Sequence, residues 1–174
     1  MGNVVAALRL LSLMAIIASN AAPPAPAQET KVEPLALAVA DFDYTDTSGE
    51  ARDQQEAHAA QLEQFVQSVR DELAQGDAYR IVPLSCPNTP CTARSTDPAT
   101  LIKAAQDSGA RLLLYGGIQK MSTLIQYGKA QVVDLETDRL VFDKNISFRG
   151  DDDAAWDHAA EFLARELKKA ELAK

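Results

Sequence analysis

Four carboxylates fall within one short segment of this 174-residue chain, close behind an apolar run. They are Asp41, Asp43, Asp46 and Glu50. Carboxylate oxygens are the ligands that hard cations prefer, and calcium takes about six to eight of them. The segment lacks the central glycine that turns an EF-hand loop, so residues 41–50 fit a solvated acidic loop better than a calcium loop. A site for a divalent cation or another small molecule in this acidic loop is the alternative interpretation.

An aromatic ring and an ammonium group add to the side chains that could meet a partner. Tyr44 lies inside the acidic loop, and Lys144 interrupts the apolar row of a later segment, as lysines at sheet edges do. Loops at the carboxyl ends of strands are frequent binding sites in α/β folds. We expect Tyr44 and Lys144, together with Asp43, Asp46 and Glu50, to contact another protein.

The sequence contains no set of residues that is typical of catalysis. His58 and His158 are the two histidines, and neither belongs to a recognisable motif with a serine or cysteine nucleophile. Gly116 and Gly117 follow an apolar run but are not part of a phosphate-binding loop motif. We therefore expect a protein that is not an enzyme, with no catalytic residue and no cofactor.

Cys86 and Cys91 have four residues between them, in a turn-rich segment that contains two prolines. In an oxidising compartment such a pair forms a disulfide. A redox-active pair usually has about two intervening residues, and a closed zinc site needs further ligands that His58 and His158 are poorly placed to supply. We expect a local structural disulfide between Cys86 and Cys91.

The amino-terminal segment has the pattern of a secretory signal peptide. Arg9 supplies a positive charge, Leu10–Ile17 is apolar, and Ala18–Ala27 offers small residues for cleavage after Ala21 or Ala27. The apolar stretch is far shorter than the roughly 20 residues that span a bilayer. We expect export to the periplasm and no stable membrane insertion.

Two regions follow from this division of the chain. Residues 1–27 form the signal peptide with its Pro/Ala-rich export tail, and residues 28–174 form one α/β domain. The chain is 47% apolar and 24% charged, with a formal net charge of −8, as in a packed acidic globular protein. Nucleic-acid binding needs a clustered basic surface, and the sequence has none, so we expect no nucleic-acid partner.

The elements expected from periodicity alternate between apolar strands and amphipathic helices. Strands are expected at Leu35–Phe42, Tyr79–Leu84, Arg111–Ile118, Leu124–Leu135 and Arg139–Phe148, and helices at Glu56–Ala74, from Pro98 to Gly109, and after Asp151–Asp153. The segment Asp43–Glu50 is expected to be a polar loop. The order β-α-β-α-β-β-β-α predicts a single α/β (α+β) domain with a mixed five-stranded sheet and helices packed on it.

Three strings in the sequence resemble the amino-terminal domain of the TolB type, which also occurs in exported bacterial proteins of unknown function. They are LALAVADF at Leu35–Phe42, GARLLLYGGIQK at Gly109–Lys120 and AQVVDLETDRLVFDK at Ala130–Lys144. The resemblance covers nearly all of Leu35–Leu167. It implies a binding or assembly module without catalytic residues.

These observations together favour a non-catalytic accessory or binding protein of the periplasm. We expect it to engage another envelope or periplasmic protein through a sheet edge or the loops at strand ends. The alternative is a periplasmic protein that binds a small molecule or a divalent cation in the acidic loop 41–50.

Overall fold

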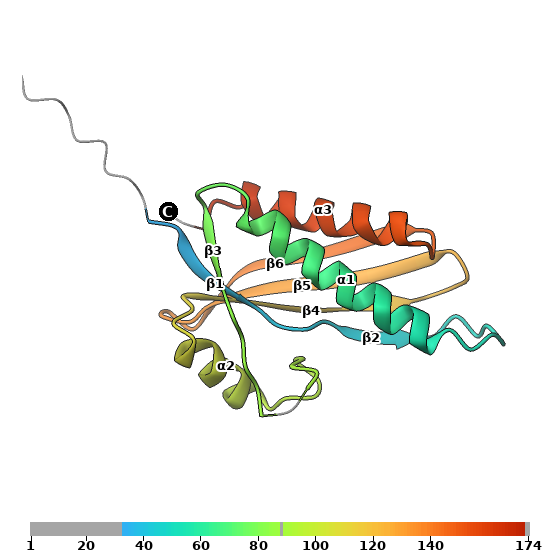
Figure 1. Cartoon of the computed structure of the whole chain (residues 1–174), viewed down its shortest axis with the longest axis horizontal. Coiled ribbons are helices and arrows are strands. Elements are labelled where there is room, and N and C mark those ends of the chain that lie inside the picture. Colours follow the sequence, from blue (N-terminus) through green and yellow to red (C-terminus); the bar gives the residue numbers. More distant parts are fainter. Residues whose placement is uncertain (1–32, 88, 173–174) are drawn as a thin grey trace, which may run out of the picture. The chain divides into compact units, whose positions relative to one another are not determined.

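Six strands form one mixed sheet, and three helices pack on it (Figure 1). The structure is a computed structural model that describes residues 33–87 and 89–172, so the expected signal peptide at 1–27 lies outside the described residues. The strands are β1 (Leu35–Val39), β2 (Asp43–Asp46), β3 (Tyr79–Val82), β4 (Leu112–Lys120), β5 (Ile125–Asp134) and β6 (Arg139–Arg149). The helices are α1 (Gln55–Ala74), α2 (Pro98–Asp107) and α3 (Asp153–Lys169).

The strand order is β3-β1-β4-β5-β6, with β2 also paired to β4. The strand β1 runs parallel to β3 and β4, whereas β4, β5 and β6 are antiparallel neighbours. The predicted fold class is therefore confirmed, and so is the order of the predicted elements.

The predicted number of strands was wrong by one, because the start of the acidic loop forms β2. Val39 lies opposite Leu114 and Asp43 opposite Gly117, so β1 and β2 follow one another along β4. A polar sequence can form this strand because none of the three described helices covers one face of the sheet at β2. Its side chains on that face, Asp43 among them, hydrogen-bond to a neighbouring loop instead of packing in the core.

The two faces of the sheet carry two separate cores. Leu37 and Val39 pack with the apolar stripes of α1 and α3, while Ala36 and Ala38, which alternate with them, pack under α2. Trp156 of α3 is 1% exposed and belongs to the first core, as its place in the helical stripe predicts.

Helix α2 is short and covers only part of its face of the sheet. Asp97 caps the helix by accepting a hydrogen bond from the backbone N–H of Thr100, and Pro98 occupies the first turn. Leu101 and Ala105 face β1, β3 and the beginning of β4. No helix formed by residues 33–87 or 89–172 lies on the rest of this face, over β2, the second half of β4, β5 and β6.

Candidate functional site

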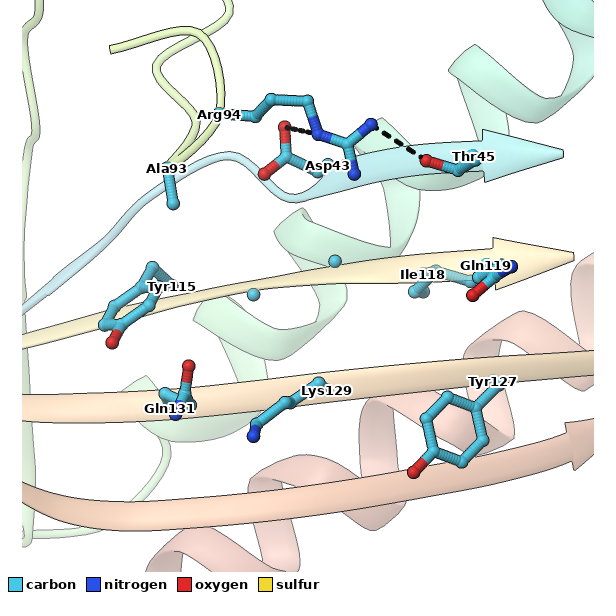
Figure 2. Close-up of a pocket in the computed structure, with 12 residues that line it drawn as sticks. Asp43, Thr45, Ala93, Arg94, Tyr115, Ile118, Gln119, Tyr127, Lys129 and Gln131 are labelled. Atoms are coloured by element: carbon cyan, nitrogen blue, oxygen red, sulfur yellow. Dashed lines mark hydrogen bonds and ion pairs between the residues drawn. The ribbon is translucent and has the colours of Figure 1, made fainter. Parts of the chain in front are cut away.

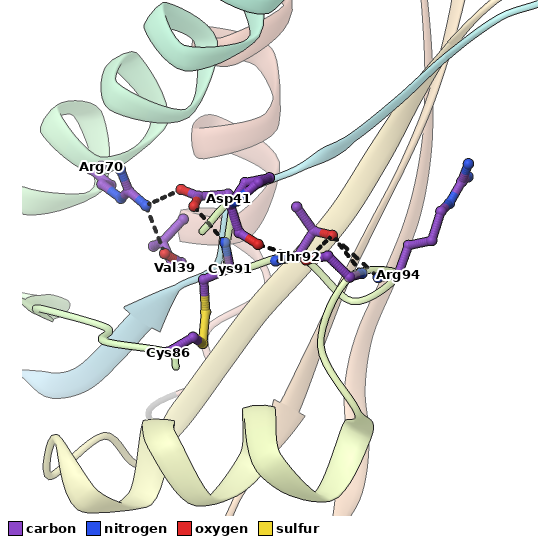
Figure 3. The surroundings of a disulfide bond; sticks show 9 residues. Val39, Asp41, Arg70, Cys86, Cys91, Thr92 and Arg94 are labelled. Atoms are coloured by element: carbon purple, nitrogen blue, oxygen red, sulfur yellow. Dashed lines mark hydrogen bonds and ion pairs between the residues drawn. A yellow bond between two sulfur atoms is a disulfide. The ribbon is translucent and has the colours of Figure 1, made fainter. Parts of the chain in front are cut away.

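Asp41 and Asp43 hold the cysteine loop against the sheet (Figure 3). One oxygen of Asp41 accepts from the backbone N–H of Cys91 at 2.9 Å, and the other accepts from the Arg70 guanidinium at 3.2 Å. The carboxylate of Asp43 accepts from the Thr92 hydroxyl at 2.7 Å. These two acids, predicted as partner-binding or metal-binding groups, therefore anchor a loop of their own chain.

The cysteine loop is closed by a disulfide between Cys86 and Cys91, whose Cα atoms are 5.6 Å apart. Cys91 is buried under α2 together with Leu101, while Cys86 is only partly buried. The loop thus joins β3 to α2 and also extends the small core on this face of the sheet.

Glu50 belongs to a buried ionic cluster that the sequence did not reveal. Its carboxylate contacts the ammonium of Lys120, a residue that is 0% exposed. The same ammonium donates to Asp151 at 2.6 Å and to the side-chain oxygen of Gln54 at 2.9 Å. Three chain segments therefore meet at one buried charge: the loop before α1, the end of β4 and the linker before α3.

The opposite charges in this cluster stabilise one another in their ionised forms. Burial alone would raise the pKa of Asp151, but hydrogen bonds from Lys120 and His58 hold it below its ordinary value. Burial likewise works to lower the pKa of Lys120, and hydrogen bonds to Asp151 and Glu50 raise it above its ordinary value. Both groups are therefore charged at neutral pH, and the cluster is a structural ion-pair network.

His58 and Tyr44 lie beside this cluster. His58 is 2% exposed, and its Nε2 lies 3.1 Å from the carboxylate oxygens of Asp151. The ring of Tyr44 packs on His58 at a centroid distance of 5.0 Å and on Trp156 at 6.0 Å. Tyr44 is thus partly buried and packed between the sheet and the helices. Its contact with a partner stays a prediction.

The remaining predicted residues lie in two different places. Lys144 does sit on the edge strand β6, where its ammonium donates to Glu166 of α3 at 2.6 Å. Asp46 is exposed at the end of β2, and its carboxylate accepts from the backbone N–H of Ser48. The five predicted residues are therefore not brought together into one surface.

The four acids of the alternative cation site are also separated by their partners. They bond to Arg70, to Thr92, to the backbone of Ser48 and to Lys120, respectively. Within residues 33–87 and 89–172, no group of three or more His, Cys, Asp or Glu side chains is placed to hold a metal ion.

The uncovered part of the sheet contains a shallow hollow of about 460 Å³ (Figure 2). Gly117 leaves its floor without a side chain, and the rings of Tyr115 and Tyr127 stand at its two ends. Arg94 reaches across Asp43 to donate to the hydroxyl of Thr45 at 3.0 Å. Burial raises the pKa of Tyr115, so its phenol remains neutral and can donate a hydrogen bond.

This surface was not predicted from the sequence, although the sequence contains a signal for it. In β5 the exposed residues alternate strictly with buried ones, and two of the exposed positions are Ile125 and Tyr127. An apolar side chain on the wetter face of an amphipathic strand is the signal that could have located it.

In the part of the chain that the structure describes, no helix combines the length and the apolar character that a membrane span requires.

Comparisons with known proteins bear on family and fold. The model of the DUF3280 family, described as "Protein of unknown function (DUF2380)", matches residues 35–167. No curated protein matches this sequence.

Among solved structures, the hypothetical protein CT253 from Chlamydia trachomatis is similar, with a TM-score of 0.50 and 10% identity, over 79% of this chain and 96% of that chain. The PelC dodecamer from Paraburkholderia phytofirmans has a TM-score of 0.50 and 13% identity, over 81% of this chain and 89% of that chain. TolB from Acinetobacter baumannii is also matched, with a TM-score of 0.48 and 10% identity, over 80% of this chain and 29% of TolB. At these identities the first two matches show a shared fold.

Proposed function

The chain belongs to the DUF3280 family, and we propose that it is a non-catalytic accessory protein of the bacterial periplasm that acts by binding another envelope or periplasmic protein. The single observation that carries this proposal is the sheet face that α2 leaves uncovered. Tyr127 on that face is 42% exposed, and Ile125 beside it is 37% exposed. Exposed apolar groups that cluster on one surface are typical of sites where proteins interact.

The state of the ionisable residues supports a binding role over a catalytic one. His58 is enclosed and bonded to Asp151, and Lys120 is enclosed among carboxylates. His158 is exposed on α3, and no hydrogen bond or ion pair of its side chain is found among the described residues. Among the described residues, neither histidine is hydrogen-bonded to a serine, threonine or cysteine side chain.

The proposed location rests on the signal-peptide pattern of residues 1–27, on the resemblance to the TolB type and on the cysteine pair. A disulfide persists in the periplasm, where thiols are kept oxidised. The proposed function is therefore assigned to the exported form of the protein.

The test is affinity capture of the exported protein from periplasmic extract, with a matched pair of variants. Tyr127→Glu places a charge on the uncovered face, and Gln67→Glu places one on the exposed side of α1. One protein should be captured in a fixed ratio by the wild type and by Gln67→Glu, and at least tenfold less by Tyr127→Glu. The proposal fails if the wild type captures no protein in a fixed ratio.

A second measurement separates binding from catalysis. His158→Gln should leave capture unchanged, because this histidine lies on the helix side of the domain. A hydrolytic activity that the wild type shows and His158→Gln loses would overturn the non-catalytic assignment.

A further inference from the structure

The tip of the β4–β5 hairpin carries an apolar patch that continues into the hollow. We call the residues Met121, Leu124, Ile125 and Tyr127 the tip patch; their exposed fractions are 51%, 47%, 37% and 42%. Residues 121–128 contain no charged side chain, in a chain that is 24% charged. Tyr127 also lines the hollow, so the patch meets the hollow at this residue.

Cations flank this surface on both sides. Arg149 lies opposite Ile125 in the β5–β6 register, so both side chains stand on the same face of the sheet. Arg149 is exposed, and no ion pair or hydrogen bond of its side chain is found within residues 33–87 and 89–172. On the far side of the hollow, Arg94 has a side chain that is 69% exposed and lies 3.9 Å from Asp43.

This arrangement contrasts with the rest of a chain whose formal net charge is −8. The acidic residues of α1 and α3 lie on the opposite side of the sheet, since those helices pack on its other face. An apolar patch is complementary to an apolar ridge with carboxylates on its flanks when a guanidinium stands on each side of it. Arg149 has no side-chain partner among the described residues, and Arg94 is largely exposed although it donates to Thr45 and lies near Asp43.

The backbone of the sheet restricts the conformation of an occupant. Strands β4 and β5 are hydrogen-bonded on both sides, so the face above them offers no backbone donor or acceptor. An extended segment lying on this face would leave its own N–H and C=O groups unpaired where it is buried, whereas a helix satisfies them internally.

The width of the surface also suits one helix. The neighbouring strands β2, β4, β5 and β6 are about 4.8 Å apart, which gives a width of roughly 14 Å. A helix with its side chains is about 10–12 Å across. Helix α2 already covers the adjoining part of the same face.

We propose that the uncovered face binds one amphipathic helix of the partner protein, with its apolar ridge on the tip patch and with Asp or Glu side chains toward Arg149 and Arg94. Polar side chains of the helix would lie over the hollow, whose lining includes Gln119, Lys129 and Gln131. This inference rests on the proposed function and adds the position and chemistry of the partner segment.

The test is site-specific photo-crosslinking of the full-length protein in the bacterium that encodes it. The probe p-benzoylphenylalanine replaces Tyr127 in one variant and Gln67 on α1 in the control. Position 127 should yield an adduct with one protein, and peptide mass spectrometry should identify a segment with acidic residues beside an apolar stripe. A synthetic peptide of that segment should gain helicity in circular dichroism when it binds.

A charge-reversal pair tests the contact with Arg149. Arg149→Glu should weaken binding of the synthetic peptide by about tenfold, while Arg139→Glu, at the other end of β6, should change it less than twofold. An acid-to-arginine change in the peptide should restore binding to Arg149→Glu.

Each other outcome separates the inference from the proposed function. An adduct at position 67 alone would overturn the inference and leave a protein-binding function in place. An adduct at 127 with a second copy of this chain, with lipid or with a segment that stays extended would also overturn it. Adducts at neither position, with no protein captured from extract, would overturn both.

Discussion

Lys120 illustrates how a single buried charge joins segments that are distant in the sequence. Its ammonium contacts Glu50 and Asp151, whose side chains are 22% and 16% exposed. Removal of one partner from a buried pair leaves the other charges without compensation, and such changes cost about 3–5 kcal/mol. We expect Lys120→Met to lower the free energy of unfolding by about 3 kcal/mol. This value is at the lower end of that range because water still reaches both carboxylates. Urea denaturation followed by the fluorescence of Trp156 measures it.

The control and the compensating variant make this prediction specific. Lys103→Met removes an exposed pair with Asp107 on α2 and should cost less than about 0.5 kcal/mol. Adding Glu50→Gln and Asp151→Asn to Lys120→Met should recover part of the loss, because no unpaired charge then remains. A loss for Lys120→Met as small as that of the control would show that the cluster is not a stabilising network.

Asp134 should make the stability of the protein depend on pH in the acid range. A hydrogen bond from Arg111, opposed by burial and helped by the backbone N–H groups of Glu136 and Thr137, lowers its pKa to about 2. The unfolded chain has the ordinary value near 4, so this contribution is complete above about pH 4 and is lost as the pH falls toward 2. Asp134→Asn should therefore be less stable at pH 7 and should lose less stability than the wild type between pH 4 and pH 2.

Thermal unfolding at several pH values tests the role of Asp134. Asp77→Asn, in the exposed loop after α1, should follow the wild-type curve. Parallel curves for Asp134→Asn and wild type below pH 4 would contradict the assignment.

For single residues, the sequence shows which side chains are charged, but it does not show which residues they contact in the folded protein. The acid at position 151 resembles a helix cap, but Asp152 is the residue that caps α3, by accepting from the backbone N–H of Ala155. Asp151 turns to Lys120 instead, and no spacing rule connects these two positions because the fold alone brings them together. The buried ionic cluster could therefore not be predicted from the sequence.

Among the elements, the cysteine loop is fixed by more than its disulfide. The backbone N–H of Cys91 donates to Asp41, and the hydroxyl of Thr92 donates to Asp43. A disulfide that closes a short loop contributes about 2 kcal/mol. We expect Cys86→Ser with Cys91→Ser to leave a folded protein with a lower melting temperature, measured by calorimetry.

Thiol titration and a second variant complete this test. Protein isolated from periplasm should contain no free thiol, and two titratable thiols would contradict the disulfide in the exported protein. Asp41→Asn added to the cysteine double variant should lower the melting temperature further, because the loop then loses a second anchor.

The predicted elements are those in which apolar and polar side chains occupy different faces, or in which nearly all side chains are apolar. Strand β1 is apolar on both faces, and the hairpin β5–β6 alternates between a buried and a wetter face, so both were predicted. Strand β2 escaped prediction because Asp43 and Thr45 face the uncovered side, where polar groups are stable. The hollow escaped because it depends on how much of the sheet α2 covers, and the periodicity of single elements does not determine that.

For the whole molecule, the expected processing gives a direct measurement. Protein isolated from periplasm should begin at Ala22 or Gln28, because small residues precede both positions. Intact-mass spectrometry decides between the two. A mass that includes residues 1–17, found in the membrane fraction, would contradict cleavage of a signal peptide.

The position of β1 in the sheet has a consequence for how the chain acquires its structure. Although β1 comes first, it lies between β3 and β4, and Leu37 finds its register partners at Ile81 and Leu112. A polypeptide that emerges from a ribosome or a translocation pore with its amino terminus first cannot complete this sheet until β4 has followed. Parallel pairings between distant segments form slowly compared with local helices. We therefore expect the strand order to delay folding of the nascent chain, and an unfolded polypeptide is the form that can be threaded across a membrane.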